Sequence, residues 1–499
     1  MKKTFLNQQQ KSLFSKGILY LIFLIASQSI LAQTAQSPAI ELTDSDRTFI
    51  ELRAAAKKND VARSQQLAAS LKNYPHQDYV TYYRIKPKLF NAAGEALADS
   101  AADAEVKDFI VKYQGTALAD RMRNDWLLVL GKRKDWIQFD VHYPQFALND
   151  DTQLKCYALQ SQLEQGQNPT KLAIDSREFL LNPRYYGQAC AELVASLVEA
   201  GGMTAAEGAA VARSASEMGL DTTAKQMRVK DPISEVVKSA RANPAKAYKS
   251  FTANASQYTE DEQAVAWGVI GQFLAKKLDP NADDAFRMQQ GLGFNELLST
   301  ESQEWKVRAG LRAKDWKLVK DAIEGMNSAV RRKDPAWTYW YGRALEVDGQ
   351  KDKARMRYEF IADQYSFYGQ LAKEELGASN RPPSRTKVTQ EEVNVMANRA
   401  GFLRGAQFYA MNLRFEGNRE WNWELRGMTD RQLLASAEYA KRIHLYDRVV
   451  NTADRTVQEH DFSLRYPTPF QDELTPITEH INLNLAWAYG LIRQESRFI

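Results

Sequence analysis

Apolar residues recur at helical spacing from about residue 40 to residue 376, in Ala-rich segments separated by short breaks at Gly, Asn-Pro or Asp-Pro. Alternating apolar and polar runs rich in β-branched residues, which would indicate strands, are almost absent from this part of the sequence. The pattern therefore predicts an all-α fold in which many short helices follow one another.

Two segments with related sequences indicate that these helices form repeats. Residues 126–136 are echoed by residues 305–316: in both, a helix ends in a basic turn and an Asp caps the next helix, whose first turn carries Trp. Gly342, Ala354 and Tyr358 match the small and aromatic positions of a tetratricopeptide hairpin. Such hairpins cannot bury their apolar faces alone, so neighbouring hairpins are expected to stack into a superhelix.

The tryptophans of these repeats are interpreted as packing residues and not as platforms for sugars. The residues concerned are Trp126, Trp136, Trp305, Trp316, Trp337 and Trp340.

Two proline-containing breaks divide the chain. Residues 377–385 contain two prolines and no large apolar residue, which predicts a linker. A helix cap and an acidic first turn at residues 389–392 then open a second helical domain, predicted for residues 389–458. The second break, at residues 465–470, leads into a final segment that begins a third domain, which the chain does not complete.

The N-terminus has the features of a secretory signal peptide in residues 1–32. Its four lysines and no acidic residue are followed by an apolar run at residues 18–26 and by Ala32 before the polar Gln33. A membrane anchor is the alternative, but the run is shorter than the roughly 20 residues that span a bilayer. We therefore predict export, with no transmembrane span in the mature chain.

Charge and cysteine content narrow the possible partners and cofactors. Residues 1–32 hold four of the 66 basic and none of the 62 acidic residues, so the mature chain is neutral. Neutrality argues against nucleic acid as a partner, because phosphate binding needs concentrated Lys and Arg.

Cys156 and Cys190 form a plausible disulfide in an oxidising compartment. The five histidines are scattered without metal-ligand spacing, so we predict no metal and no cofactor.

Glu495 is the residue with the clearest potential for chemistry. Residues 486–499 have helical spacing, with Arg493 and Arg497 on the face opposite to Glu495. We expect Glu495 to be buried, and burial without a cation favours the protonated form, which suits a proton donor. An exposed position at the edge of the stripe, or an interhelical ion pair, remains open. The apolar residues that share its stripe are Ala488, Leu491, Ile492 and Ile499.

The string Ile492-Arg493-Gln494-Glu495-Ser496 resembles the first catalytic motif of the soluble lytic murein transglycosylases, periplasmic enzymes that cut the glycan strands of bacterial peptidoglycan. Residues 305–316, 337–345 and 367–377 resemble that family as well, so the likeness extends over nearly the whole mature chain. It implies a superhelical domain (33–380) that closes into a ring and a helical linker domain (389–458). Residues 466–499 would be the beginning of a lysozyme-like catalytic domain.

The resemblance implies that Glu495 is the catalytic acid and base. In the family, one glutamic acid protonates the bridging oxygen between N-acetylmuramic acid and N-acetylglucosamine, and its carboxylate then takes the proton of the muramic acid 6-hydroxyl. A 1,6-anhydro sugar results, without water and without the second carboxylate of ordinary glycosidases. Ser496 either helps to orient the carboxylate or is a solvated serine. Peptidoglycan strands, and possible penicillin-binding proteins, are the partners that the family implies.

The chain departs from the family after the glutamate, where the family continues with a Gly-Leu-Met-Gln motif and further residues of the glycan cleft. Nothing of this follows Ile499, so we expect the chain as given to be truncated or partial and unable to turn over substrate. The alternative function is that of a non-catalytic periplasmic helical-repeat protein that binds glycan strands or a cell-wall partner. A third possibility, a scaffold for outer-membrane assembly, is favoured only by the repeats.

Overall fold

The computed structural model describes residues 42–180, 184 and 186–499, so the predicted signal peptide lies outside the described residues. In these residues every regular element is a helix, apart from two isolated β-bridges, Phe90–Ala96 and Arg385–His460. The all-α prediction is therefore confirmed. The chain forms two compact units: an N-terminal unit, Thr43–Pro383, and a C-terminal unit that contains Ser384–Ile499.

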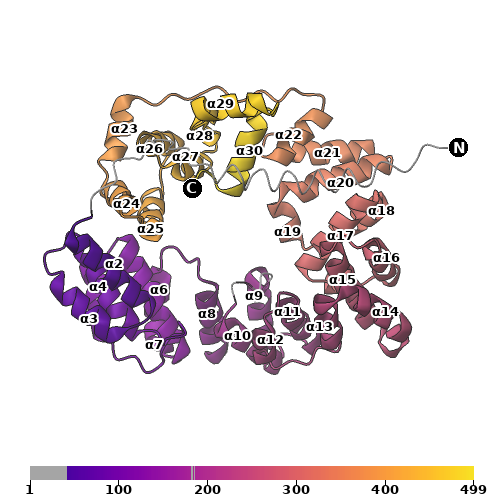
Figure 1. Cartoon of the computed structure of the whole chain (residues 1–499). Coiled ribbons are helices and arrows are strands. Elements are labelled where there is room, and N and C mark those ends of the chain that lie inside the picture. Colours follow the sequence, from indigo (N-terminus) through magenta and orange to yellow (C-terminus); the bar gives the residue numbers. More distant parts are fainter. Residues whose placement is uncertain (1–41, 181–183, 185) are drawn as a thin grey trace. The chain divides into compact units, whose positions relative to one another are not determined.

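Short helices that pack on their neighbours in sequence build the N-terminal unit, and their successive stacking gives the predicted superhelix (Figure 1). The helices before residue 230 are α2 (Asp44–Lys57), α3 (Val61–Ser70), α4 (Gln77–Ile85), η1 (Lys86–Lys88), α5 (Asp103–Lys112), α6 (Ala117–Lys132), α7 (Trp136–His142), η2 (Tyr143–Gln145), α8 (Thr152–Glu164), α9 (Pro169–Leu180), α10 (Gln188–Glu199), α11 (Ala205–Glu217) and α12 (Asp221–Gln226). The later helices are α13 (Ser234–Ala242), α14 (Pro244–Asn254), η4 (Ala255–Gln257), α15 (Glu260–Lys276), α16 (Ala282–Leu292), η5 (Asn295–Leu297), α17 (Thr300–Ala313), α18 (Trp316–Glu324), α19 (Ser328–Lys333), α20 (Pro335–Val347), α21 (Lys351–Ile361) and α22 (Phe367–Glu375).

The two echoed segments fold in the same way, as the sequence predicts. The α6–α7 and α17–α18 connections each place a lysine, Lys134 and Lys314, in the left-handed region with φ of 59° and 58°. The aspartate that follows caps the next helix: Asp135 accepts from the backbone N–H of Gln138, and Asp315 from that of Leu318. The same local sequence thus produces the same turn twice.

Close approach between α20 and α21 requires a small residue at the predicted position. A Cβ atom on Gly342 would lie 2.5 Å from the ring of Tyr358, which is a buried residue of the α20–α22 core. A larger residue at this position would force the two helices apart.

Six repeat tryptophans were expected to be packing residues, and the structure divides them into two groups. Trp126 and Trp337 are buried. The other four, Trp136, Trp305, Trp316 and Trp340, are only half-buried, although Trp305 packs on one apolar core and Trp316 and Trp340 on another. These four residues contribute to packing and remain partly exposed.

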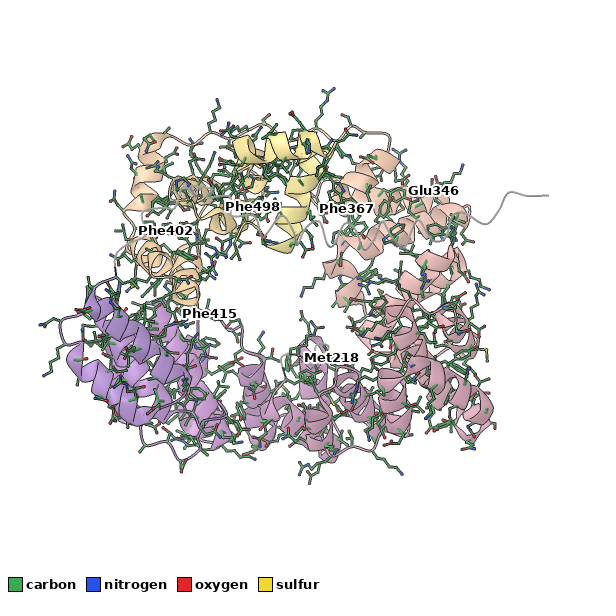
Figure 2. All side chains as sticks on the ribbon, in the orientation of Figure 1. Met218, Glu346, Phe367, Phe402, Phe415 and Phe498 are labelled. Carbon is green, nitrogen blue, oxygen red and sulfur yellow. A yellow bond between two sulfur atoms is a disulfide. The ribbon has the colours of Figure 1, made fainter. Side chains whose placement is uncertain are left out.

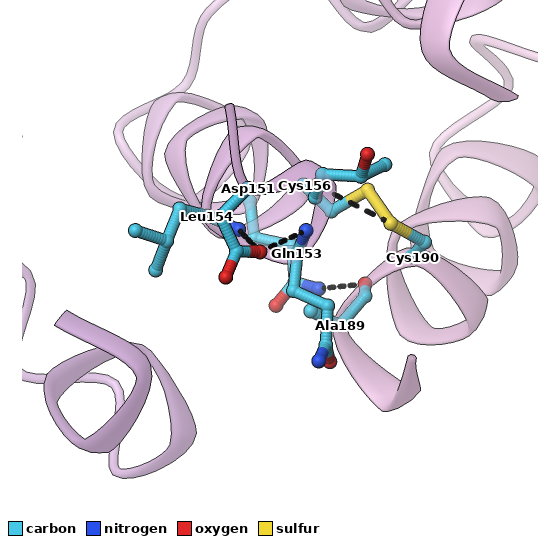
Figure 3. Close-up of a disulfide and its surroundings, with 8 residues drawn as sticks. Asp151, Gln153, Leu154, Cys156, Ala189 and Cys190 are labelled. Atoms are coloured by element: carbon cyan, nitrogen blue, oxygen red, sulfur yellow. Dashed lines mark hydrogen bonds between the residues drawn. A yellow bond between two sulfur atoms is a disulfide. The ribbon is translucent and has the colours of Figure 1, made fainter. Parts of the chain in front are cut away.

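A disulfide joins Cys156 on α8 to Cys190 on α10, with both cysteines fully buried (Figure 3). The two helices are also held together beside it, because the Gln160 side chain on α8 donates to the carbonyl oxygen of Ala189 at 2.6 Å. Asp151 caps α8 by accepting from the backbone N–H groups of its first turn.

Glu217, at the end of α11, is a buried carboxyl group that has no ion pair of its own in the described part of the chain. Ser299, which caps α17, donates to it at 2.5 Å, and the Gln272 amide on α15 donates at 3.0 Å in the orientation that satisfies its neighbours. The nearest cations, Arg213 and Lys276, are paired with Asp231 and with Glu301. Burial raises the pKa of Glu217 to about 7, although the Ser299 hydrogen bond and the two cations oppose this and Glu301 adds to it.

Because of this carboxyl group, the folded state is expected to become less stable as the pH rises. The folded protein keeps the proton up to about pH 7, whereas the unfolded chain releases it near the ordinary pKa of 4.5. The folded state therefore binds more protons between these values, and raising the pH lowers the free energy of unfolding. When the pH is raised from 5 to 8, the free energy of unfolding of Glu217→Gln should increase by about 2 to 3 kcal/mol relative to that of wild type. Urea unfolding at both pH values measures this change.

The exposed Glu296 in the same unit provides the matched control for that measurement. Glu296→Gln should differ from wild type by the same amount at pH 5 and pH 8. If the difference between Glu217→Gln and wild type is also the same at both pH values, the pKa of Glu217 is not raised in solution.

The helices between residues 390 and 465 surround one apolar core that includes Phe402, Trp421 and Leu434. Between α22 and α23 lies the predicted linker, and the predicted cap is present because Thr389 and Glu392 form a capping box at the start of α23. The domain boundaries at residues 380, 389, 458 and 466 stay predictions. The helices are α23 (Gln390–Ala397), α24 (Ala400–Ala410), α25 (Arg414–Glu424), α26 (Asp430–Arg442), α27 (Tyr446–Ala453), α28 (Phe462–Arg465), α29 (Gln471–His480) and α30 (Leu485–Glu495).

From residue 42 onward, leaving aside residues 181–183 and 185, no helix is both long enough and apolar enough to cross a membrane.

Candidate active site

The predicted catalytic string lies at the C-terminal end of α30. Asn484 caps the start of this helix by accepting from the backbone N–H of Ala486 at 2.8 Å. Tyr489 is buried, and its hydroxyl group donates to the carbonyl oxygen of Pro469 at 2.8 Å. The middle of α30 is thereby fixed to the segment that precedes α29.

Arg493 anchors the end of α30 to the rest of the C-terminal unit. Its guanidinium group donates to both carboxylate oxygens of Asp454, at 3.2 and 3.1 Å, and to the carbonyl oxygen of Arg465 at 3.0 Å. The same group lies 4.7 Å from the ring centre of Tyr466. Arg497 also approaches Asp454, at 3.9 Å. The two arginines therefore point to the α27 side, as expected from their spacing, and leave the opposite face of α30 to Glu495.

Glu495 itself is exposed, so the expectation of a buried carboxyl group is wrong for the described chain. Glu495 does lie on the face opposite to Arg493, but no described segment covers that face. Leu491, one turn earlier, is 47% exposed, and Trp487, two turns earlier, is 62% exposed. These three residues, four apart in sequence, form an exposed ridge along α30, here called the α30 ridge.

The helix is also shorter than its spacing suggested. It ends at Glu495, and Arg497 and Phe498 adopt left-handed φ values of 52° and 66° (Phe498 is labelled in Figure 2). Ile499 therefore lies outside the helix and does not extend the apolar stripe. Glu495 is thus the last residue of α30, where a side chain is accessible from more directions than in the middle of a helix.

Ser496 makes hydrogen bonds to the backbone at this helix end. Its hydroxyl group donates to the carbonyl oxygen of Ile492 at 3.1 Å and accepts from the backbone N–H of Phe498 at 3.1 Å. These bonds stabilise the turn that ends α30, and neither of them is made to Glu495. Any help that Ser496 gives to the carboxylate therefore acts through the shape of the turn.

Helix α29, which packs on α30, carries further exposed apolar residues on the helix and at its two ends. Phe470, Ile477 and Ile481 are each between 57% and 59% exposed. In the part of the chain that is described, no three His, Cys, Asp or Glu side chains are grouped so that they could hold a metal ion.

Sequence reasoning found Glu495 and the two arginines, but it missed the residues that hold them. Asp454 and Tyr466 had no signal of their own, since one follows a helix of ordinary composition and the other precedes a proline. Their roles depend on contacts across 39 and 27 positions of sequence, which no local pattern reveals.

Comparisons with known proteins place these features in context, although no protein-family model matches the chain. A soluble lytic murein transglycosylase of Escherichia coli K12 is 19% identical over 509 aligned residues, covering 95% of this chain and 77% of the relative. That of Salmonella typhimurium LT2 is 22% identical over 235 residues, or 46% of this chain and 34% of the relative. An inactive variant of the lytic transglycosylase Slt of Pseudomonas aeruginosa, with a glutamate replaced by glutamine, has a similar fold. Its TM-score is 0.52 at 22% identity, covering 92% of this chain and 78% of that one.

Proposed function

Because the chain belongs to the soluble lytic murein transglycosylase family, we propose that the protein expressed from its gene cuts the β-1,4 bond between N-acetylmuramic acid and N-acetylglucosamine in peptidoglycan. The observation that carries the proposal is the position of Glu495. The family-like string places this carboxylate at the exposed end of α30, while Arg493 holds the helix in place from the other side. In the Pseudomonas aeruginosa relative, exchanging one glutamate for glutamine gives an inactive protein, which supports a role for a single carboxylate.

In the proposed reaction, one carboxyl group serves both steps. Glu495 donates its proton to O4 of N-acetylglucosamine as the bond from this oxygen to C1 of N-acetylmuramic acid breaks. The resulting carboxylate accepts the proton of the muramic acid 6-hydroxyl group, whose oxygen forms a new bond to C1. The products are a free 4-hydroxyl end and a 1,6-anhydro sugar. The proton of O6 is transferred through Glu495, so no water is consumed.

This chemistry requires that water be excluded from Glu495 while the substrate is bound, because a shielded carboxyl group holds its proton more readily than a solvated one. The α30 ridge suits this requirement. A sugar strand that lies along Trp487 and Leu491 would cover apolar surface and reach Glu495 at the end of the helix. Binding and shielding would then be the same event.

Access to the cell wall is also part of the proposal, so we place the protein in the periplasm. The basic N-terminus followed by an apolar run supports export.

The test is a digestion of purified murein sacculi with the protein expressed from its own gene. Mass spectrometry of the soluble products should show muropeptides that end in 1,6-anhydromuramic acid. Products with ordinary reducing ends would indicate hydrolysis instead, and would overturn the proposed mechanism.

A second candidate function is non-catalytic binding of glycan strands, which the open position of Glu495 favours. In that case, the protein should sediment with sacculi and release no soluble muropeptides during prolonged incubation.

A further inference from the structure

A hollow of about 560 Å³ lies in the N-terminal unit, between α17 and the connection from α15 to α16. One wall is formed by α17 through Trp305, Arg308 and Arg312, which share a face of the helix because they lie three and four positions apart. The opposite wall includes Leu278 and Pro280. We refer to this feature as the α17 hollow.

Trp305 is held in a fixed orientation at the α17 hollow. Its indole N–H donates to Glu301 at 3.2 Å, and the Arg308 guanidinium group lies 5.1 Å from the centre of its ring. The ring packs on the core formed around α15 and α16, yet the residue remains half-buried and lines the hollow. An aromatic ring fixed in this way loses little conformational freedom when a ligand packs on its exposed part.

The charges around the α17 hollow leave one cation available. Arg308 is paired with Glu304 at 3.2 Å, and Arg287 with Asp283 and Asp315 at 3.5 and 3.1 Å. Arg312 is exposed and, as far as the chain is described, forms no ion pair. A ligand group with negative charge would therefore find its partner at Arg312.

We propose that the α17 hollow binds a segment of the glycan strand, with a sugar ring packed against Trp305 and a carboxylate of its peptide substituent paired with Arg312. A pyranose ring presents C–H groups that pack on an indole, and a guanidinium group binds carboxylates in a bidentate manner. The inference rests on the proposed function, since peptidoglycan supplies both groups. It adds a binding site on a different unit from Glu495.

The charge distribution favours a glycan over an acidic peptide. Asp279 and Asp283 also line the hollow. An acidic peptide would bring several negative charges close to these carboxylates, which opposes binding. A sugar backbone is neutral and carries carboxylates only on its substituents, so a single unpaired arginine suffices.

The test measures binding without turnover, in the Glu495→Gln background, by titration calorimetry with soluble glycan strands that carry stem peptides. Adding Arg312→Glu should weaken binding by about tenfold, because it replaces an attraction by a repulsion at the proposed carboxylate site. Arg312→Lys should restore part of the affinity. The matched control is Arg332→Glu, the same charge reversal at an exposed residue of α19 that does not line the hollow, and it should bind as the parent does.

Two simpler ligands, a neutral oligosaccharide and the free stem peptide, distinguish the contribution of the sugar from that of the peptide. The neutral oligosaccharide chitotetraose should bind more weakly than the natural strand and should not respond to Arg312→Glu. If the free stem peptide binds as tightly as the strand, the hollow is a peptide site and the proposal is wrong. Equal affinities for Arg312→Glu and Arg332→Glu would also overturn it. Neither result bears on the proposed reaction, which is judged by the anhydro products.

Discussion

Replacing Glu495 by glutamine is expected to slow the release of anhydro-muropeptides from sacculi by a factor of about 10² to 10⁴, the usual contribution of general acid–base catalysis. Glutamine has almost the same shape as glutamic acid, but it can neither donate the proton to O4 nor accept the proton of the 6-hydroxyl group. Both steps of the proposed reaction therefore fail together. The initial rate of release, measured by mass spectrometry with the protein expressed from its own gene, gives the factor directly.

Glu479 on α29 offers the matched control, because it is an exposed glutamate of the same unit. Glu479→Gln should release products at the wild-type rate. Binding to sacculi should be retained in both variants, because neither exchange alters the apolar surface of Trp487 and Leu491 or the Arg493 anchor. If Glu495→Gln keeps more than about a tenth of the wild-type rate, the loss is too small for general acid–base catalysis and the catalytic assignment is wrong.

The features that could be predicted from the sequence are those that depend on interactions between residues a few positions apart. The helical periodicity gave the all-α class, and the cap residues gave the starts of α7, α18 and α23 correctly. In each case a side chain within three positions satisfies the first free N–H groups of the helix. The need for glycine opposite Tyr358 could also be predicted, because a hairpin repeat defines which positions come into contact.

The environment of Glu495 could not be predicted in this way. A helical pattern shows which residues share a face, but it does not show whether another segment covers that face. In the predicted stripe, Leu491 is exposed, Ala488 and Ile492 are only half-buried, and Ile499 lies beyond the end of the helix, so the stripe does not face a core. The anchor of α30 is similarly non-local, since Asp454 and Arg493 are 39 positions apart.

Trp305 is a second residue whose surroundings could not be predicted from the sequence. Its position in a repeat predicts packing, and the ring does pack on the α15–α16 core. The ring also lines the α17 hollow, whose opposite wall is formed by the connection between α15 and α16, where Leu278 adopts a left-handed φ of 57°. The sequence alone gave no reason to expect a cavity beside this residue.

Removing the Cys156–Cys190 disulfide is expected to lower the free energy of unfolding of the N-terminal unit by about 3 to 4 kcal/mol. The bond closes a loop between residues 34 positions apart, and it restricts the unfolded chain more than the folded one. Alanine is the appropriate replacement at both positions, because both cysteines are fully buried and alanine introduces no polar group that would have to be desolvated. Urea unfolding of wild type and of the Cys156→Ala, Cys190→Ala double variant, both without reductant, measures the difference.

The same pair of proteins unfolded in the presence of dithiothreitol provides the control. Once the wild-type disulfide is reduced, both unfolded chains have the same freedom, so their free energies of unfolding should agree to within about 1 kcal/mol, the usual effect of removing a small buried group. Amide hydrogen exchange should locate the effect, with faster exchange in α8 and α10 of the double variant and unchanged rates in α26 and α27. If the full difference persists under reducing conditions, the two sulfur atoms stabilise the unit by packing, and the cross-link itself contributes little.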